Sequence, residues 1–199
     1  DVLIGTQMVT KGHDLPRVTL VGVVNADAAL SVPDHRASER AFQLLVQVAG
    51  RAGRGDLPGT VVVQSRDPSH PAIRFAMRHD VAGFVEHELR EREELSYPPF
   101  VRMALIRVEA IDLALAKREA TAIAHAIKAT PQVQAGSVQV LGPAEAPIAK
   151  LRSRHRYQVL VRSQDRRLLR QALAPAIALR ERIDRRVHVI VDVDPVQMM

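Results

Sequence analysis

Cysteine and tryptophan are absent from this chain of 199 residues, and aromatic residues make up only 3% of it. Without cysteine, these residues form neither a disulfide nor a thiolate zinc site. The eight histidines are scattered, and no two have the spacing of a metal-binding helix. No apolar run approaches the roughly 20 residues that cross a bilayer, and no secretory leader is recognisable. We therefore expect no metal site here, no membrane partner and a cytoplasmic location.

The composition that remains is ordinary for a globular protein, with 47% hydrophobic and 25% charged residues. The length suits one large domain or two small ones. The chain begins with Asp1 and then Val2-Leu3-Ile4, an apolar run typical of a strand already in progress. We therefore expect a fragment of a longer protein.

Positive charge is concentrated in the second half of the chain. Residues 1–100 carry 11 Lys/Arg and 13 Asp/Glu, a net charge of −2, whereas residues 101–199 carry 17 and 9, a net charge of +8. Such a field favours a polyanionic partner. A well-solvated basic surface without a partner is the alternative.

The first half alternates strand-like and helix-like patterns. Val18–Asn25 is rich in β-branched residues and is typical of a buried strand in a parallel sheet. Ser38 is a good amino-terminal cap for a helix with Phe42, Leu45 and Val48 on one face. This rhythm predicts an α/β layer with a parallel sheet. The expected segments are strand 2–5, strand 18–25, helix 38–52, strand 60–64, helix 71–78 and helix 81–96.

A double proline in Tyr97-Pro98-Pro99-Phe100 cannot continue a helix and predicts an extended turn. We place a domain boundary there, giving domains 1–96 and 97–199. The second domain follows the order β-α-β-β-α-β, which is the ferredoxin-like order of an antiparallel sheet with two helices. Its expected segments are strand 101–109, helix 113–128, strand 138–141, strand 157–162, helix 166–179 and strand 187–193.

The most informative segment runs from Gln47 to Arg54. Arg51 and Arg54 are three residues apart at the expected end of a helix, so they can converge on one target. A guanidinium matches phosphate oxygens as a fork and keeps its charge, which is what an arginine finger requires in phosphoryl transfer. Gly50 and Gly53 allow close approach. A surface helix with two solvated arginines and a glycine cap is the alternative.

A second segment, Gly5 to Pro16, directly follows the first expected strand. The turn Gly5-Thr6-Gln7-Met8 exposes amides and hydroxyls that suit phosphate, and the Asp14 carboxylate can accept from a ribose hydroxyl or an arginine. Alone, this segment equally fits an ordinary loop. Together, and separated by a hydrophobic strand, the two segments resemble motifs V and VI of superfamily 2 helicases.

The resemblance extends to the primosomal protein N′ family of replication-restart DNA helicases, whose carboxy-terminal portion this chain is similar to from residue 1 to about residue 195. Two departures are His35, where the family commonly has an aromatic residue, and Leu15, which replaces a frequent Phe. The matching runs are residues 5–8, 11–14, 27, 33–34, 36–40, 47–54, 97–100, 142–143 and 192–195.

This resemblance implies that the first domain is the end of a RecA-like helicase lobe that closes over ATP and Mg held mainly by another lobe. Arg51 and Arg54 would be the catalytic fingers that reach the γ-phosphate, with Gln47 beside them at the lobe interface.

The resemblance also assigns roles to the loop before the hydrophobic strand. Gly12 and Asp14 would belong to the nucleotide site and would couple the state of the bound nucleotide to DNA binding. Thr6 and Gln7 would lie near the DNA backbone. The second domain would resemble a small ribosomal-subunit protein in fold. Its implied partners are forked and single-stranded DNA, the single-stranded-DNA-binding protein and other primosome proteins.

The best local candidate for DNA contact is the stretch containing Lys150, Arg152, Arg154 and Arg156, which we place in a loop between two strands. Such charges release counterions from DNA, so binding should weaken with salt. Because Tyr157 is the only aromatic residue nearby, we expect recognition of backbone rather than bases. A flexible basic loop without a partner is the alternative.

Several parts of a complete helicase are missing from the sequence. It contains neither a Gly-x-x-x-x-Gly-Lys-[Ser/Thr] loop nor an Asp-Glu-x-His box nor the family's cysteine-rich zinc insertion. We expect these, and any zinc, upstream. The prediction is thus part of an ATP-dependent 3′-to-5′ DNA helicase that is inactive by itself. A non-enzymatic nucleic-acid-binding module and a primosome docking module are the alternatives.

Overall fold

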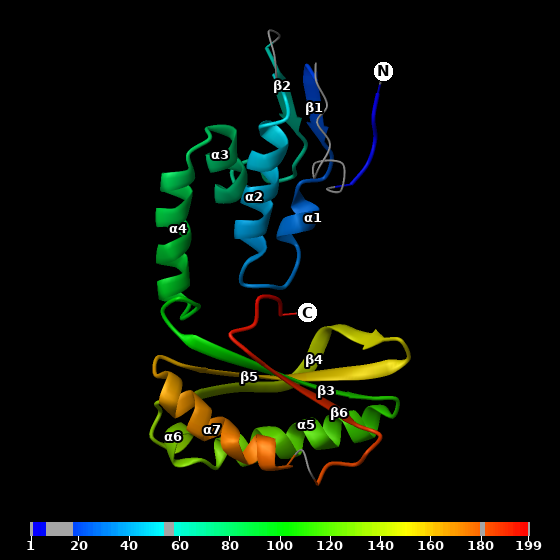
Figure 1. Cartoon of the computed structure of the whole chain (residues 1–199), viewed down its shortest axis with the longest axis vertical. Helices are drawn as coiled ribbons and strands as arrows, with labels where there is room; N and C mark the ends of the chain where they lie inside the picture. The colour runs from blue at the N-terminus through cyan, green and yellow to red at the C-terminus, as the bar shows by residue number, and fades with distance from the viewer. Residues whose placement is uncertain (1, 7–17, 54–57, 180–181, 199) are drawn as a thin grey trace. The chain divides into compact units, whose positions relative to one another are not determined.

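The structure, a computed structural model, describes residues 2–6, 18–53, 58–179 and 182–198 (Figure 1). It divides into two compact units, Asp1–Glu91 and Arg92–Met199, here called the amino-terminal and carboxy-terminal units. The division falls within helix α4 (Val81–Glu94). Within the described ranges, every helix is too short or too polar to cross a membrane.

The amino-terminal unit contains a parallel sheet of two strands, which confirms the parallel pairing expected for this half. Strand β1 (Leu20–Val23) pairs with β2 (Thr60–Val63), with Leu20 opposite Thr60 and Val23 opposite Val63. Three further helices accompany the sheet and α4: α1 (Asp27–Leu30), α2 (Ala37–Ala49) and α3 (Pro71–Met77).

Helix α2 supplies the centre of this unit's core. Phe42, Leu45 and Val48 are buried, as their spacing predicts. The Phe42 ring stacks on Phe84 of α4, with ring centroids 4.0 Å apart and planes within 7°. Ile73 of α3 is also fully buried against this group. One apolar cluster therefore holds α2, α3 and α4 together.

Two strand predictions for this half were wrong in part. Residues 2–6 form no strand, and Val2 and Ile4 are each 89% exposed. A strand needs a paired neighbour, and none lies beside these residues in the described parts of the chain. The expected strand 18–25 shortens to β1 and is not buried. Its Leu20 is 64% exposed because the described helices pack against Val23 and Val63 on the other face.

The carboxy-terminal unit is a four-stranded antiparallel sheet with the strand order β4-β5-β3-β6. Its main elements follow one another as β-α-β-β-α-β, with one short additional helix, α6. The elements are β3 (Arg102–Ala110), α5 (Leu113–Lys128), α6 (Pro131–Gln134), β4 (Gln139–Leu151), β5 (Arg154–Ser163), α7 (Arg166–Leu179) and β6 (His188–Val193).

Both faces of this sheet contribute to a core. Helices α5 and α7 lie on one face (Figure 1), where Ile106, Val159, Ile123 and Leu169 are at most 1% exposed. The opposite face has a smaller cluster of Val101, Met103, Leu105 and Met198. The chain end at Met198 therefore covers part of the face that the helices leave open.

Strands β4 and β5 correct the expectation of a long loop between residues 142 and 156. Strand β4 continues to Leu151, with register shifts after Leu141 and after Glu145. At Gly142, φ is +96° and an added Cβ would lie 2.8 Å from the Gln158 carbonyl oxygen. Only glycine allows β4 to pass so close to β5 in this conformation.

Candidate functional site

Arg51 lies in a turn directly after α2, which corrects the expectation that it stands on the helix. The helix ends at Ala49, and the Gly50 N–H donates to the Val46 carbonyl at 3.0 Å. The Arg51 N–H then turns back to the Val48 carbonyl, also at 3.0 Å. Gly50 ends the helix three residues earlier than expected because glycine is a poor helix former.

The same turn is attached to the strand region at its far end. The Gly53 N–H donates to the Val18 carbonyl at 3.0 Å, and the positive φ of Gly53 (+73°) suits glycine. Arg51 is half-buried, close to the carboxyl end of α2, where the helix dipole stabilises a cation. Gln47 is exposed in the last turn of α2. The structure thus brings Gln47 and Arg51 to one end of this helix.

At the other end of α2, Asp34 replaces Ser38 as the anchoring residue. Ser38 lies inside the helix, and the capping position, Arg36, makes no side-chain cap. The buried Asp34 carboxylate accepts from the Arg36 N–H at 2.9 Å and from Arg40 Nη1 at 3.2 Å. Arg36 in turn donates to Glu39 with both Nε and Nη2. These residues lie in the runs that matched the helicase family, but their structural role was not foreseen.

Asp27 at the start of α1 anchors the segment after β2. Its carboxylate accepts from the Arg66 N–H at 3.0 Å and the Ser65 hydroxyl at 2.8 Å. The hydrogen bond from Arg66, followed by that from Ser65, lowers the pKa of Asp27. The ionised Asp27 carboxylate therefore connects the start of α1 to the segment after β2.

The other predicted site residues of the amino-terminal unit are Thr6, Gln7, Gly12, Asp14 and Arg54. Thr6 is exposed and lies outside any helix or strand. Gln7, Gly12, Asp14 and Arg54 lie outside the described residues. Their assignments stay predictions.

The predicted DNA-binding stretch is a tight hairpin rather than a loop. Leu151 at the end of β4 pairs with Arg154 at the start of β5, and Lys150 pairs with His155. Arg152 and Ser153 form the turn with φ of +47° and +64°. Positive φ at both central residues is typical of two-residue hairpin turns. Lys150 and Arg152 are exposed and Arg154 is half-buried.

Arg156, the fourth predicted residue, points into the fold. Its side chain is 4% exposed, and its Nε lies 3.2 Å from Glu109 Oε1. Its Nη1 also donates to the Ile148 carbonyl at 3.5 Å. Arg154, two residues earlier on β5, is half-buried, and its buried Nη1 atom has no hydrogen-bond partner in the described residues. The structure therefore leaves Lys150 and Arg152 exposed at the tip, with the half-buried Arg154 beside them, and turns Arg156 into the fold.

Two apolar side chains near the tip were not foreseen. Ile148 is 42% exposed and Leu151 is 48% exposed, both on β4. In sequence they looked like ordinary members of an irregular loop, and only the hairpin places them beside the basic residues. The described part of the chain contains no group of three or more His, Asp or Glu positioned for a metal ion.

Residues 93–196, which include the whole four-stranded sheet, match the family described as "Primosomal protein N C-terminal domain". The chain belongs to the primosomal protein N family. Two relatives, each named "Replication restart protein PriA", match this member over 100% of its length. That of Bacillus subtilis (strain 168) is 41% identical over 201 residues, and that of Treponema pallidum (strain Nichols) is 42% identical over 199.

This member of the primosomal protein N family spans 25% and 30% of the lengths of those two relatives. Among solved structures, a de novo designed protein, Foldit4, covers 48% of the chain and 97% of its own, with 16% identity and a TM-score of 0.38. That similarity is too weak to identify a fold.

Proposed function

We propose that this chain is the carboxy-terminal part of an ATP-dependent 3′-to-5′ DNA helicase that reloads the replication machinery at stalled forks. The two relatives that match the chain over its whole length are each named as a replication restart protein. The observation that carries the proposal is the turn after α2, which holds Arg51 on a backbone fixed at both ends.

In this proposal Arg51, with Arg54, is an arginine finger for a nucleotide held elsewhere. A rigid turn positions a guanidinium without the entropy cost of ordering a loop. Gln47 lies at the same helix end and would contact the same nucleotide. The chain lacks a Gly-x-x-x-x-Gly-Lys loop, so ATP and Mg would be bound mainly by residues that precede it. Any zinc would also belong to that preceding part.

The two-stranded parallel sheet supports a RecA-like lobe that is completed by preceding residues. Parallel sheets in proteins are covered on both faces, yet Leu20 and Val62 are 64% and 55% exposed. Further strands and helices of the longer protein would cover them. The proposed roles of Gly12, Asp14, Thr6 and Gln7 rest on this lobe assignment and on the family resemblance.

For the carboxy-terminal unit we propose a ferredoxin-like fold. The order β4-β5-β3-β6, with α5 and α7 on one face, supports this assignment. The unit would contact forked or single-stranded DNA through the hairpin tip formed by Lys150, Arg152 and Arg154. Cations on a short, exposed hairpin suit the phosphate backbone rather than base edges. Arg156 would hold the hairpin in place from inside.

The test of the catalytic role is Arg51→Ala in the longer helicase that contains this chain. ATP turnover should fall about 10³-fold or more, while fork DNA binding should remain near normal. Arg51→Lys is the matched control and should also be slow, because a lysine cannot form the bidentate fork. Normal turnover in Arg51→Ala would refute the finger assignment. DNA-stimulated ATP turnover by the 199-residue chain alone would refute the division of the site.

A second candidate function is a non-enzymatic module that binds nucleic acid or docks in the primosome, including on the single-stranded-DNA-binding protein. The net charge of +8 on residues 101–199 favours this candidate, because a basic surface attracts nucleic acid whether or not an ATP site is present. A longer natural protein that binds fork DNA but never turns over ATP would favour this candidate over the helicase.

A further inference from the structure

Strand β4 leaves its partner β5 over a stretch just before the hairpin tip. The ladder pairs Glu145 with Tyr157 and next pairs Lys150 with His155. Residues 146–149, here called the bulge, therefore have only one residue of β5 opposite them. In Figure 1 this part of β4 rises away from the rest of the sheet. Bulges bend a strand and redirect its side chains, and they recur beside functional sites.

The bulge is held at both ends and in its middle. Ala146 at its start is only 4% exposed, and Lys150 after its end returns to the ladder. The Ile148 carbonyl accepts from Arg156 Nη1 at 3.5 Å. The Nε of the same arginine lies 3.2 Å from Glu109 Oε1. A segment fixed in this way loses little conformational entropy when it binds a partner.

Apolar and basic side chains stand next to one another along this part of the hairpin. Ile148 is 42% exposed and Leu151 is 48% exposed, and the cations Lys150 and Arg152 are exposed beside them. Leu151 lies opposite the half-buried Arg154, so both side chains are on one face of the hairpin. A matching partner offers negative charge and apolar surface together. Nucleic acid does so, because phosphates flank the flat faces of its bases.

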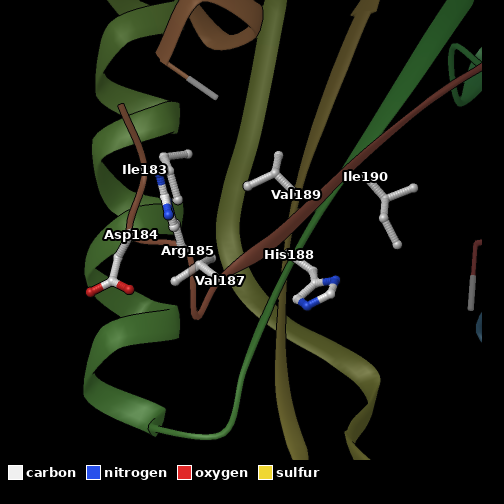
Figure 2. A pocket seen from close by; sticks show the side chains of 7 residues that line it. All are labelled: Ile183, Asp184, Arg185, Val187, His188, Val189 and Ile190. Carbon is white, nitrogen blue, oxygen red and sulfur yellow. The ribbon is translucent and has the colours of Figure 1, made fainter. Parts of the chain in front are cut away.

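The protruding bulge on edge strand β4 differs from the hollow beside β6, the other edge strand. That hollow, of about 360 Å³, is lined by the turn after α7 and the start of β6, between Ile183 and Ile190 (Figure 2). A hollow receives a group from its ligand, whereas a protruding apolar side chain must enter a gap in its partner. Opening a gap between stacked bases costs least where a base is already unpaired.

We propose that the hairpin recognises the junction between double-stranded and single-stranded DNA. Ile148 and Leu151 enter between the last base pair and the first unpaired base, and Lys150 and Arg152 contact phosphates of the strand that leaves the duplex. The recognition does not depend on sequence, because every base has an apolar face. This inference rests on the proposed DNA contact of the hairpin tip and adds the DNA structure that the tip selects.

A fluorescent base at the junction tests the insertion without any substitution in the 199-residue chain. The probe is a DNA fork with 2-aminopurine, whose fluorescence is quenched by stacking, as the first unpaired base. Its fluorescence should rise on binding, whereas 2-aminopurine in the middle of the duplex should not respond. Anisotropy of a labelled fork reports binding separately. A bound fork without the rise would overturn the inference and leave the proposed DNA contact standing. Absence of fork binding would overturn both.

The variant I148A/L151A tests which side chains are responsible. It should lower fork affinity about tenfold, because the apolar contact is lost, and it should abolish the rise in fluorescence. Its affinity for a covalently closed duplex circle, which has no junction, should stay unchanged. The cation variant K150A/R152A should instead weaken fork and circle alike, because both carry phosphates.

Two further variants serve as controls. I177A/L113A removes similar aliphatic groups, 55% and 45% exposed, from α7 and α5 and should change neither affinity. I148V/L151M keeps the apolar surface and should retain the preference for the fork over the circle. Full fork affinity in I148A/L151A would overturn the inference, as would an equal loss of fork and circle affinity in that variant.

Discussion

Arg156 and Glu109 face each other across strands β5 and β3, with the arginine Nε 3.2 Å from the glutamate Oε1. The arginine side chain is only 4% exposed. Because its Nη1 also reaches the Ile148 carbonyl, one guanidinium connects β3, β4 and β5. A buried charge of this kind is tolerated only while it is paired. The pair therefore fixes the base of the hairpin whose tip carries Lys150 and Arg152.

Arg156→Ala should lower the free energy of unfolding of the carboxy-terminal unit by about 2 kcal/mol, because it leaves Glu109 without its partner. Urea denaturation followed by circular dichroism measures this change. The double variant R156A/E109A should regain part of the loss, since no unpaired charge remains. If Arg156→Ala unfolds at the wild-type urea concentration, the pair has no structural role.

Gly142→Ala should destabilise the same unit strongly, by about 2 kcal/mol or more. Its φ of +96° is unfavourable for alanine, and the new Cβ would lie 2.8 Å from the Gln158 carbonyl oxygen. Thermal unfolding gives the comparison directly.

Gly136 offers the control for Gly142. It also has a positive φ, +74°, but nothing lies within 4 Å of an added Cβ. Gly136→Ala should therefore show only the conformational cost, about 1 kcal/mol. Equal losses at the two glycines would mean that the close approach of β4 and β5 contributes nothing.

Helices α5 and α7 were predicted with their observed bounds, and the reason is local. Asp112 accepts from the Leu115 N–H at 2.9 Å, and Asp165 accepts from the Arg167 N–H at 2.6 Å. Each aspartate satisfies the amino end of an amphipathic helix within three residues of sequence. Capping residues and helix periodicity of this kind act between neighbours in the sequence, so they can be recognised from the sequence alone.

The parts of the fold that were missed depend on distant partners. Val2–Gly5 has the composition of a strand, but composition does not show whether a neighbouring strand is present. The long β4 was hidden because Pro143 and Pro147 interrupt its alternation. Its pairing becomes evident only beside β5. Sequence also lacked the Asn-Gly pair that commonly marks a hairpin turn.

The candidate sites show the same division. The number of charges near residue 150 is readable from the sequence, but the direction of each side chain is not. The structure turns Arg156 inward while Arg152 stays exposed. The family resemblance identified Arg51, yet the turn that holds it is attached through the hydrogen bond from the Gly53 N–H to the distant Val18 carbonyl. The roles of Arg54, Gly12 and Asp14 remain predictions from the resemblance.

Acid should weaken the carboxy-terminal unit through Asp184. Hydrogen bonds from the Arg186 side chain and then its backbone hold the pKa of Asp184 well below its usual range. A lowered folded-state pKa contributes stability that is complete above about pH 4 and is lost as the pH falls further. Asp184→Asn should therefore show a smaller loss of urea resistance on acidification than the wild type. An identical acid loss would exclude Asp184 as a contributor.

The hairpin tip should set the salt dependence of fork DNA binding. Each cation that contacts a phosphate contributes about 0.9 to the slope of log affinity against log salt concentration. Lys150, Arg152 and Arg154 are together at the tip, so replacing all three by alanine should reduce the slope by roughly 2 to 3. Fluorescence anisotropy of a labelled DNA fork across a salt series measures it for the 199-residue chain.

Two comparisons decide whether the tip itself is responsible. Removing three exposed cations from the helices, Lys117, Arg167 and Arg170, changes the net charge equally but should leave the slope nearly unchanged. Arg156→Ala should weaken binding only through lost stability, and therefore without a separate change in slope at temperatures where the unit is folded. If the helix variant flattens the slope as much as the tip variant, DNA binding reflects overall charge rather than the hairpin.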